Sequence, residues 1–252
     1  MILTTDDGHV RTITLNRPEA MNAFDGQQFD DLTEALLAAQ AEAAVRVVII
    51  TGTGRAFTTG LDLSEVGKDI EPPKHGVPGL FNTLIDFPKP LLLAINGFGV
   101  GFGATIIGLA DMSFMAQSAR LRCPFTSLGV VGEAASTYLF PRMMGHQAAN
   151  WMLYSSAWFD ANECKESGLV LDVFPDDALL DEVMTRAQTM AANSPVALIR
   201  SKELSMGPVR EKIRATMDAE NAVYDELHGG PENMEAINAF LEKREPDFSK
   251  LG

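Results

Sequence analysis

Glycine recurs at alternate positions in residues 96–108, NGFGVGFGATIIG, between one apolar run and another. Glycine lets the chain turn sharply and lets backbone N–H groups face a cavity with no side chain in the way. If a helix begins near Phe102, its first free N–H groups and its dipole face this loop. The spacing therefore favours a backbone site for a phosphate or for an oxyanion formed during a reaction. Close packing of a helix on a sheet is the alternative explanation.

The same glycines also fit the alanine-ended dinucleotide fingerprint, with Gly99, Gly101 and Ala104 at the required spacing. That motif needs an acidic residue about 20 positions later to hold a ribose hydroxyl. Residues 112–132 contain neither Asp nor Glu, and the glycine run lies deep in the chain rather than in a first strand–helix unit. The sequence therefore disfavours a nucleotide cofactor at this loop.

A second glycine turn supports an oxyanion site. Residues 54–63, GRAFTTGLDL, follow the β-branched run VVIIT and turn at Gly60 before a short helix-like segment. Two strand–turn–helix junctions of this kind can each direct one backbone N–H to the same point. Sites that stabilise an enolate or a tetrahedral oxyanion are built in this way.

One carboxyl group stands out as a candidate general base. Glu133 is the only acid between Asp111 and Asp160, and its neighbours in GVVGEAASTY are small and apolar. It could take a proton from a substrate, or it could be a first-turn glutamate that favours a helix dipole, and the pattern alone leaves both open. The four histidines are scattered without ligand spacing, so we expect no metal site; they are His9, His75, His146 and His228.

The elements that must position these residues alternate between strand and helix. Residues 10–15 alternate apolar and polar side chains and predict a strand, and a helix capped by Asp25 follows. Continuous apolar runs predict buried strands at 47–51, 91–95 and 112–115. Residues 67–79 are rich in Gly, Pro and charge, and they predict a mobile loop.

The C-terminal quarter is predicted to be almost wholly helical. The expected helices span residues 176–192, 195–206, 209–227 and 231–241. Strands that alternate with helices and lead into a helical tail predict an α/β core with a C-terminal extension. The apolar stripes of the tail helices could cap their own core or pack against neighbouring subunits, and the pattern leaves both open.

Composition limits the possible partners. The chain has 252 residues and a formal net charge of -14. Because an acidic surface repels phosphate, nucleic acid and anionic membranes are poor partners. The polar N-terminal residues predict no signal peptide. No apolar run approaches the roughly 20 residues that a membrane span needs. The two cysteines, Cys123 and Cys164, lie far apart in the sequence and predict no disulfide framework. We expect a cytoplasmic protein without membrane association.

Four motifs in order resemble the crotonase (enoyl-CoA hydratase/isomerase) family. They are ITLNRPEAMNAF at 13–24, GRAFTTGLDL at 54–63, NGFGVGFGATIIGLADM at 96–112 and SPVALIRSKEL at 194–204. The resemblance implies a spiral of ββα units, a coenzyme A thioester substrate, and neither cofactor nor metal. It also implies a core over residues 1–194 and a helical region over 195–252 that builds homotrimers or hexamers.

The resemblance assigns site residues by position. The two oxyanion donors fall on the backbone N–H groups of Leu61 and Phe102. Many members have glycine in place of Phe102, so its side chain is a departure that puts the pocket shape in doubt. Walls of the acyl pocket are expected from residues 64–84. The adenine end of the ligand is expected near the backbone of Ala23, Ala56, Thr59 and Leu61. Gly60 and Phe102 are also expected to contact the CoA thioester.

The reaction is narrowed by two further positions. The hydratase branch places its carboxylates where this chain has Thr105 and Phe125, so plain hydration looks disabled. Residues 124–145 resemble the peroxisomal-type Δ3,Δ2-enoyl-CoA isomerase branch, whose single catalytic glutamate stands at Glu133. The alternatives are hydratase-like, thioesterase or dehalogenase-like chemistry on a CoA thioester. A further alternative is a non-catalytic relative that binds acyl-CoA or RNA, although the negative net charge of the chain disfavours RNA.

Overall fold

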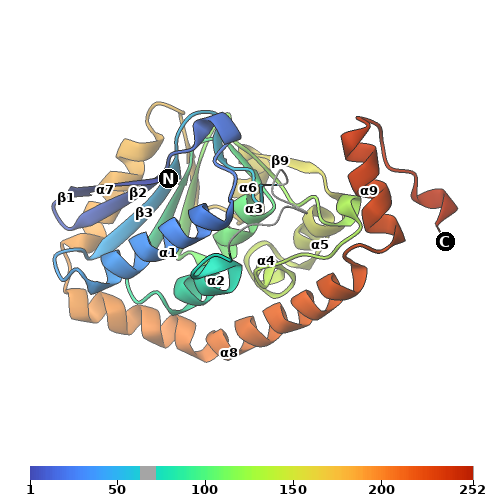
Figure 1. Cartoon of the computed structure of the whole chain (residues 1–252). Helices are drawn as coiled ribbons and strands as arrows, with labels where there is room; N and C mark the ends of the chain where they lie inside the picture. Colours follow the sequence, from blue (N-terminus) through green and yellow to red (C-terminus); the bar gives the residue numbers. More distant parts are fainter. Residues whose placement is uncertain (63–71, 252) are drawn as a thin grey trace.

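The computed structural model describes residues 1–62 and 72–251, and two β-sheets form its centre (Figure 1). The larger sheet has six strands in the order β1-β2-β3-β5-β7-β10. Their bounds are β1 Ile2–Asp7, β2 Val10–Leu15, β3 Val47–Gly52, β5 Leu91–Ile95, β7 Met112–Ala116 and β10 Asp172–Phe174. β1 pairs with β2 in antiparallel fashion, and the remaining neighbours are parallel.

The parallel strands are buried because helices cover the sheet. β5 is buried at every position, and β3 at every position but its last. A strand covered on both faces needs apolar side chains on both, and therefore appears in sequence as a continuous apolar run. The predicted strands at 10–15, 47–51, 91–95 and 112–115 are all confirmed within one residue.

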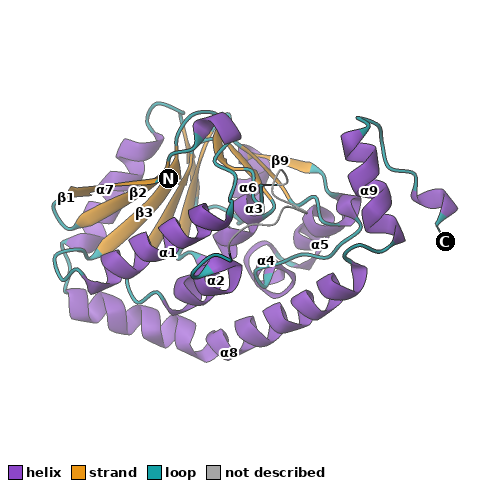
Figure 2. Cartoon of the chain, viewed as in Figure 1, coloured by secondary structure: helices purple, strands orange, loops and turns teal. Residues whose placement is uncertain are grey.

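The smaller sheet is made of short strands, of which β4, β6 and β8 each follow a strand of the larger sheet along the chain. Its order is β4-β6-β8-β9, with bounds Ala56–Thr58, Phe98–Val100, Arg120–Arg122 and Trp158–Asp160. β4 follows β3 after a turn, and β6 follows β5 in the same way. Figure 2 shows the strands in orange with the helices beside them in purple. Because β4 and β6 are parallel neighbours, their carboxyl ends meet at one edge of this sheet.

Helices cover the sheets and build the C-terminal part of the chain. The described α-helices are α1 Gly26–Ala41, α2 Gly76–Asp86, α3 Phe102–Thr105, α4 Ser136–Met144, α5 His146–Ser155, α6 Ala161–Glu166, α7 Leu179–Ala191, α8 Pro195–Leu227 and α9 Pro231–Leu241. The Asp25 side chain accepts from the Gln28 N–H, as the predicted cap requires. None of the described helices combines the length and apolar character needed to cross a bilayer.

Two predicted boundaries are wrong. The predicted loop at 67–79 ends too late, because α2 already begins at Gly76; residues 67–71 lie outside the described part of the chain. The predicted helices 195–206 and 209–227 form one helix, α8, which continues through Pro208. Pro208 is exposed, and the apolar stripe keeps its register on both sides of it, so packing overrides the local break.

One face of α8 anchors the helix to the core. Its buried residues, Lys202, Ile213 and Glu220, lie 11 and 7 positions apart and therefore on the same side of the helix. The Lys202 ammonium donates to Lys89 O at 2.9 Å and to Asp111 Oδ2 at 2.7 Å. In Figure 1, α8 runs along the lower edge of the molecule, past α2 to α4.

Candidate active site

The two predicted glycine turns meet where β4 and β6 end. Gly60 follows β4 and Gly101 follows β6, with φ of 78° and 56°. These are left-handed conformations that residues with a Cβ adopt at a cost. A Cβ built on Gly60 would lie 2.7 Å from Val100 O and 3.3 Å from the Phe102 N atom. The main chain of the first turn therefore lies against the start of α3, as two converging donors require.

Both predicted donor amides are unoccupied. Phe24 and Leu61 form an isolated parallel β-bridge, in which the Phe24 N–H donates to Gly60 O at 2.7 Å and the Asp62 N–H donates to Phe24 O at 2.9 Å. The Leu61 N–H takes part in neither of these two bonds. Phe102 is the first residue of α3, so its N–H has no partner within the helix. Neither N–H donates to an acceptor in residues 1–62 and 72–251. Two backbone donors are thus available side by side for an oxygen atom.

The Phe102 side chain does not fill the space in front of its own amide. Its ring is 3 % exposed and packs edge-on against Phe24, with centroids 5.1 Å apart. It also contacts Phe29 and Phe81, at 6.2 Å and 5.5 Å between centroids. The side chain that stands in place of glycine therefore extends the aromatic core, and its effect on the pocket shape stays a prediction.

Glu133 lies on the other side of the second turn. A Cβ built on Gly101 would have the Glu133 Oε1 atom as its nearest neighbour, at 4.0 Å. The side chain is partly buried, and the residue stands three positions before α4 begins. The open space at Gly101 thus lies between the Phe102 amide and a carboxyl group, and the sequence-predicted residues Leu61, Phe102 and Glu133 come together around it.

The environment of Glu133 raises the pKa of its carboxyl group. Burial raises the pKa of Glu133 to about 7, and the negative charge of Glu220 adds to the rise. The nearby Thr105 hydroxyl acts in the opposite direction and lowers this pKa. A carboxyl group with a pKa near the working pH can both take and return a proton.

Thr105 places a buried hydroxyl at the same point. Its residue exposure is 0 %, and its Oγ1 has no hydrogen-bond partner of standard geometry among the described residues. Leaving a buried hydroxyl unpaired costs about 1–3 kcal/mol. Because it lies beside Glu133, this hydroxyl is available to the carboxyl group or to a ligand between them.

The residues expected near the adenine end of a ligand are also brought together. Asn22 connects their two segments, because its Nδ2 donates to Thr53 O at 2.9 Å and to Ala56 O at 2.8 Å. The Thr59 N–H donates to Met21 O at 3.2 Å. Ala23 and Ala56 thus lie in adjoining segments, with Thr59, Gly60 and Leu61 directly after them. Their role in ligand binding stays a prediction.

An arginine that the motif analysis did not single out braces this region. The Arg17 guanidinium forms ion pairs with Asp25 at 3.1 Å and with Asp62 at 2.8 Å, and it donates to Ala23 O at 3.1 Å. It thereby ties the cap of α1 to the residue after Leu61. The sequence could have pointed to Arg17, because this residue lies in NRPEAMNAF, within the first of the four family motifs.

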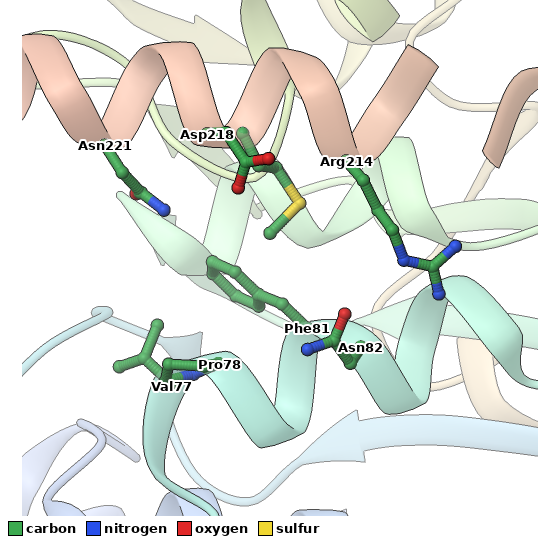
Figure 3. Close-up of a pocket in the computed structure, with 8 residues that line it drawn as sticks. Val77, Pro78, Phe81, Asn82, Arg214, Asp218 and Asn221 are labelled. Atoms are coloured by element: carbon green, nitrogen blue, oxygen red, sulfur yellow. The ribbon is translucent and has the colours of Figure 1, made fainter. Parts of the chain in front are cut away.

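A cavity of about 180 Å³ lies between α2 and α8 (Figure 3). Part of its wall comes from the predicted acyl-pocket segment, whose residues 64–71 lie outside the described part of the chain. Phe81 connects this cavity with the aromatic core, since its ring also contacts the Phe102 ring. Mixed polar and apolar side chains line the cavity, namely Val77, Pro78, Phe81, Asn82, Arg214, Met217, Asp218 and Asn221.

Glu220 is the site residue that sequence reasoning missed. It is 6 % exposed, and its carboxylate accepts from the Ala135 N–H, the Thr137 N–H and the Thr137 hydroxyl, at 2.7, 3.0 and 2.6 Å. A signal was present in the sequence, because Glu220 falls in register with the apolar stripe of α8. A carboxylate at a core position of a helix requires partners from elsewhere.

The described residues contain no cluster of three or more His, Cys, Asp or Glu side chains that could hold a metal ion. The two cysteines, Cys123 and Cys164, are free and buried. Burial raises the pKa of both thiols well above its usual value, which keeps them protonated. Among the described residues, the Glu133 carboxyl is the ionisable group that lies beside the turn before the Phe102 amide.

Comparisons with known proteins identify the family of the chain. The sequence model of the enoyl-CoA hydratase/isomerase family matches residues 5–250. The chain is 33 % identical to 2,3-dehydroadipyl-CoA hydratase of Escherichia coli over 98 % of both chains. It is 36 % identical to enoyl-CoA delta isomerase 2 of Rattus norvegicus over 96 % of this chain and 64 % of the rat protein.

A solved structure shares the whole fold. The enoyl-CoA hydratase/isomerase of Pseudoalteromonas atlantica superposes with a TM-score of 0.93 at 33 % identity, and the match covers 98 % of this chain and 99 % of that one. The relatives thus include both hydratases and isomerases at similar identity, so the comparisons alone do not choose between these reactions.

Proposed function

Because the chain belongs to the enoyl-CoA hydratase/isomerase (crotonase) family, we propose that it is an enoyl-CoA isomerase that moves a 3-enoyl double bond to the conjugated 2-position. One arrangement carries this proposal. Among the described residues, the N–H groups of Leu61 and Phe102 have no hydrogen-bond partner, and the Glu133 carboxyl group lies beside the turn that precedes Phe102.

The proposed reaction begins with the thioester carbonyl. Its oxygen accepts hydrogen bonds from the N–H groups of Leu61 and Phe102, and the negative charge that forms in the transition state moves onto this oxygen. Each well-placed donor of this kind contributes roughly 3–4 kcal/mol to the transition state. The amides need no reorganisation, because the turns at Gly60 and Gly101 already hold them in place.

Proton transfer then requires one base. The Glu133 carboxylate removes a proton from C2, and the electron pair of the C–H bond forms a dienolate. The carboxylic acid returns its proton to C4, and the double bond moves from C3–C4 to C2–C3. A pKa of about 7 supports both halves of this exchange, since the carboxylate is present at neutral pH and its acid form is not strongly disfavoured.

Hydration is less well supported by the same site. Adding water works best with two carboxylates, one that holds the water and one that supplies the α-proton. Thr105 carries a hydroxyl that does not ionise, and the second buried carboxylate, Glu220, already accepts three hydrogen bonds from the start of α4. Both facts favour an isomerase over a hydratase.

Glu133→Gln tests the proposal. We expect isomerisation of a 3-enoyl-CoA to fall by at least about 100-fold, because the amide cannot accept the proton. Binding of the thioester, followed by calorimetry, should change little, since the variant keeps the shape and both backbone donors. The exposed acid Glu211, changed to Gln, is the matched control.

The readout separates the rival reactions. Isomerisation creates the absorbance of a conjugated thioester, hydration of a 2-enoyl-CoA removes it, and hydrolysis releases free coenzyme A. Isomerisation within tenfold of wild type in Glu133→Gln would contradict the role of Glu133. Hydration or hydrolysis faster than isomerisation would contradict the proposed reaction.

We also propose that the chain assembles as a homotrimer or hexamer in the cytoplasm, with residues 195–252 contributing to the interface. Exposed apolar side chains on the last two helices support this, among them Leu204, at 79 % exposed, and Leu241. Burial of such side chains against another chain would remove their apolar surface from water.

A further inference from the structure

We propose that Glu220 is a positioning residue for the base: from α8 it caps α4 and thereby holds the turn that aims Glu133 at the two amides. This inference rests on the proposed role of Glu133. It concerns a residue 87 positions further along the chain, on a helix that carries none of the three groups proposed to act on the substrate.

The start of α4 needs an external partner. The helix is capped by Ala135, whose side chain cannot accept a hydrogen bond, so the first N–H groups of α4 lack the usual side-chain acceptor. Glu220 supplies it, because its two carboxylate oxygens accept from the Ala135 and Thr137 N–H groups. Negative charge at a helix N-terminus is favourable in addition to these bonds.

The segment between Glu133 and α4 is strained. Ala134 and Ala135 both have left-handed backbone conformations, with φ of 57° and 56°. Each costs about 1–2 kcal/mol for a residue with a Cβ, so the turn persists only when its surroundings hold it. Its own carbonyls accept from the Ser136 N–H, at Glu133 O and 3.0 Å, and from the first turn of α4, at Ala135 O. The bond from the Ala135 N–H to Glu220 fixes the middle of this turn.

Glu220 also acts on Glu133 through its charge. Burial raises the pKa of Glu220, and the hydrogen bonds that it accepts from Thr137 and Ala135 act in the opposite direction by favouring the ionised carboxylate. That charge raises the pKa of Glu133, on top of the larger effect of burial. Within residues 1–62 and 72–251, Cys123 and Tyr224 also face Glu133, and burial raises the pKa of both, so they stay protonated across the neutral range.

Position and charge make separate, measurable contributions. If Glu220 only stabilises the fold, its replacement lowers the melting temperature and leaves the ionisation of Glu133 unchanged. If it positions and tunes the base, kcat falls more than KM changes, and the acidic limb of the pH–rate profile moves. Removing a neighbouring negative charge lowers the pKa of Glu133, so the limb moves to lower pH.

Glu220→Gln is the main test, with Glu211→Gln on the same helix as the control. We expect kcat to fall about tenfold or more at saturating 3-enoyl-CoA, with KM within threefold. The acidic limb should move down by about half a pH unit or more. A limb within 0.2 units of wild type, while kcat falls, would overturn the proposal.

Two further measurements cover the other outcomes. If Glu220→Gln does not fold, Thr137→Val removes one donor from an exposed residue, and it should lower kcat and move the limb in the same direction by a smaller amount. A carbon-13 carboxyl titration of labelled glutamate follows Glu133 without any turnover. If the Glu133 titration shifts in the Glu220 variant but the Glu133→Gln enzyme stays active, the proposed function is rejected and the contact between Glu220 and Glu133 stands. If the Glu133 titration does not shift in the Glu220 variant, the role of Glu220 is rejected.

Discussion

Glu133 makes the folded protein depend on pH in a direction opposite to most carboxylates. Its pKa is raised to about 7 by burial, whereas in the unfolded chain it returns to the ordinary value of 4.5. The stability that goes with the protonated form is fully present below pH 4.5. It is lost as pH rises through 7, because the folded chain must then hold a buried charge.

Glu133→Gln should therefore stabilise the protein in base more than in weak acid. Between pH 5.5 and 8.5 the variant should gain about 1–2 kcal/mol relative to wild type, after allowance for partial exposure of the carboxyl. Urea unfolding at the two pH values measures this gain. An equal difference at both would mean that the carboxyl titrates near its ordinary pKa in the folded state.

The pH–rate profile offers an independent check of the same group. The base must be ionised to remove the C2 proton, so kcat/KM for a 3-enoyl-CoA should fall tenfold per pH unit below about pH 7. This dependence is a property of the free enzyme, and it is measured with substrate far below KM. A profile that stays flat down to pH 5 would assign proton transfer to another group.

At the scale of elements, a substitution in the turn at Gly60 tests whether this turn positions the Leu61 amide. Gly60→Ala would place a Cβ 2.7 Å from Val100 O, so the turn must shift away from α3 and take the Leu61 amide with it. Losing one donor of an oxyanion pair costs roughly 100-fold in kcat. We expect a loss of that size in isomerisation.

Gly8→Ala is the matched control for backbone strain. Gly8 also has a left-handed φ, of 58°, but nothing lies within 4 Å of its Cβ position. Both variants should lose about 1 kcal/mol of stability from the strained φ, and only Gly60→Ala should lose activity. Equal activity in the two variants would separate the turn at Gly60 from catalysis.

The elements also show where sequence reasoning ends. The strands at 47–51 and 91–95 and the two glycine turns after them were predictable, because continuous apolar runs and glycine are local signals. The smaller sheet was not, since its strands have three residues each and show no period. The contact of Glu220 with Ala135 joins residues 85 apart, and no local pattern reveals which turn a buried carboxylate will cap.

At the scale of the whole molecule, Lys202 joins the C-terminal helix to the central sheet. Burial lowers the pKa of this lysine, and Asp111 opposes the change. Lys202→Met should destabilise the protein by about 3–5 kcal/mol, because it leaves the Asp111 carboxylate without its cation. Thermal unfolding measures this loss. Adding Asp111→Asn should recover at least about 1 kcal/mol, and a fully additive double variant would argue against a coupled pair.

The proposed assembly is tested by mass in solution. Light scattering on the purified protein should give three or six times the chain mass of 27.3 kDa. Exposed apolar residues on α8 and α9 favour burial between chains, since a monomer would leave Leu204 and Leu241 in water. A concentration-independent mass of one chain would remove the proposed interface.

Helix α8 has 33 residues and is about 50 Å long, and the Lys202 anchor and the Glu220 cap lie roughly 27 Å apart along it. These two residues fasten α8 to parts of the fold that are far apart in sequence. This limits how the chain can be recombined with its relatives. A chimera with its crossover near residue 194 would take α8 from a relative and so replace the Glu220 contacts with segment 133–137. Segment 133–137 and α8 therefore have to be exchanged together.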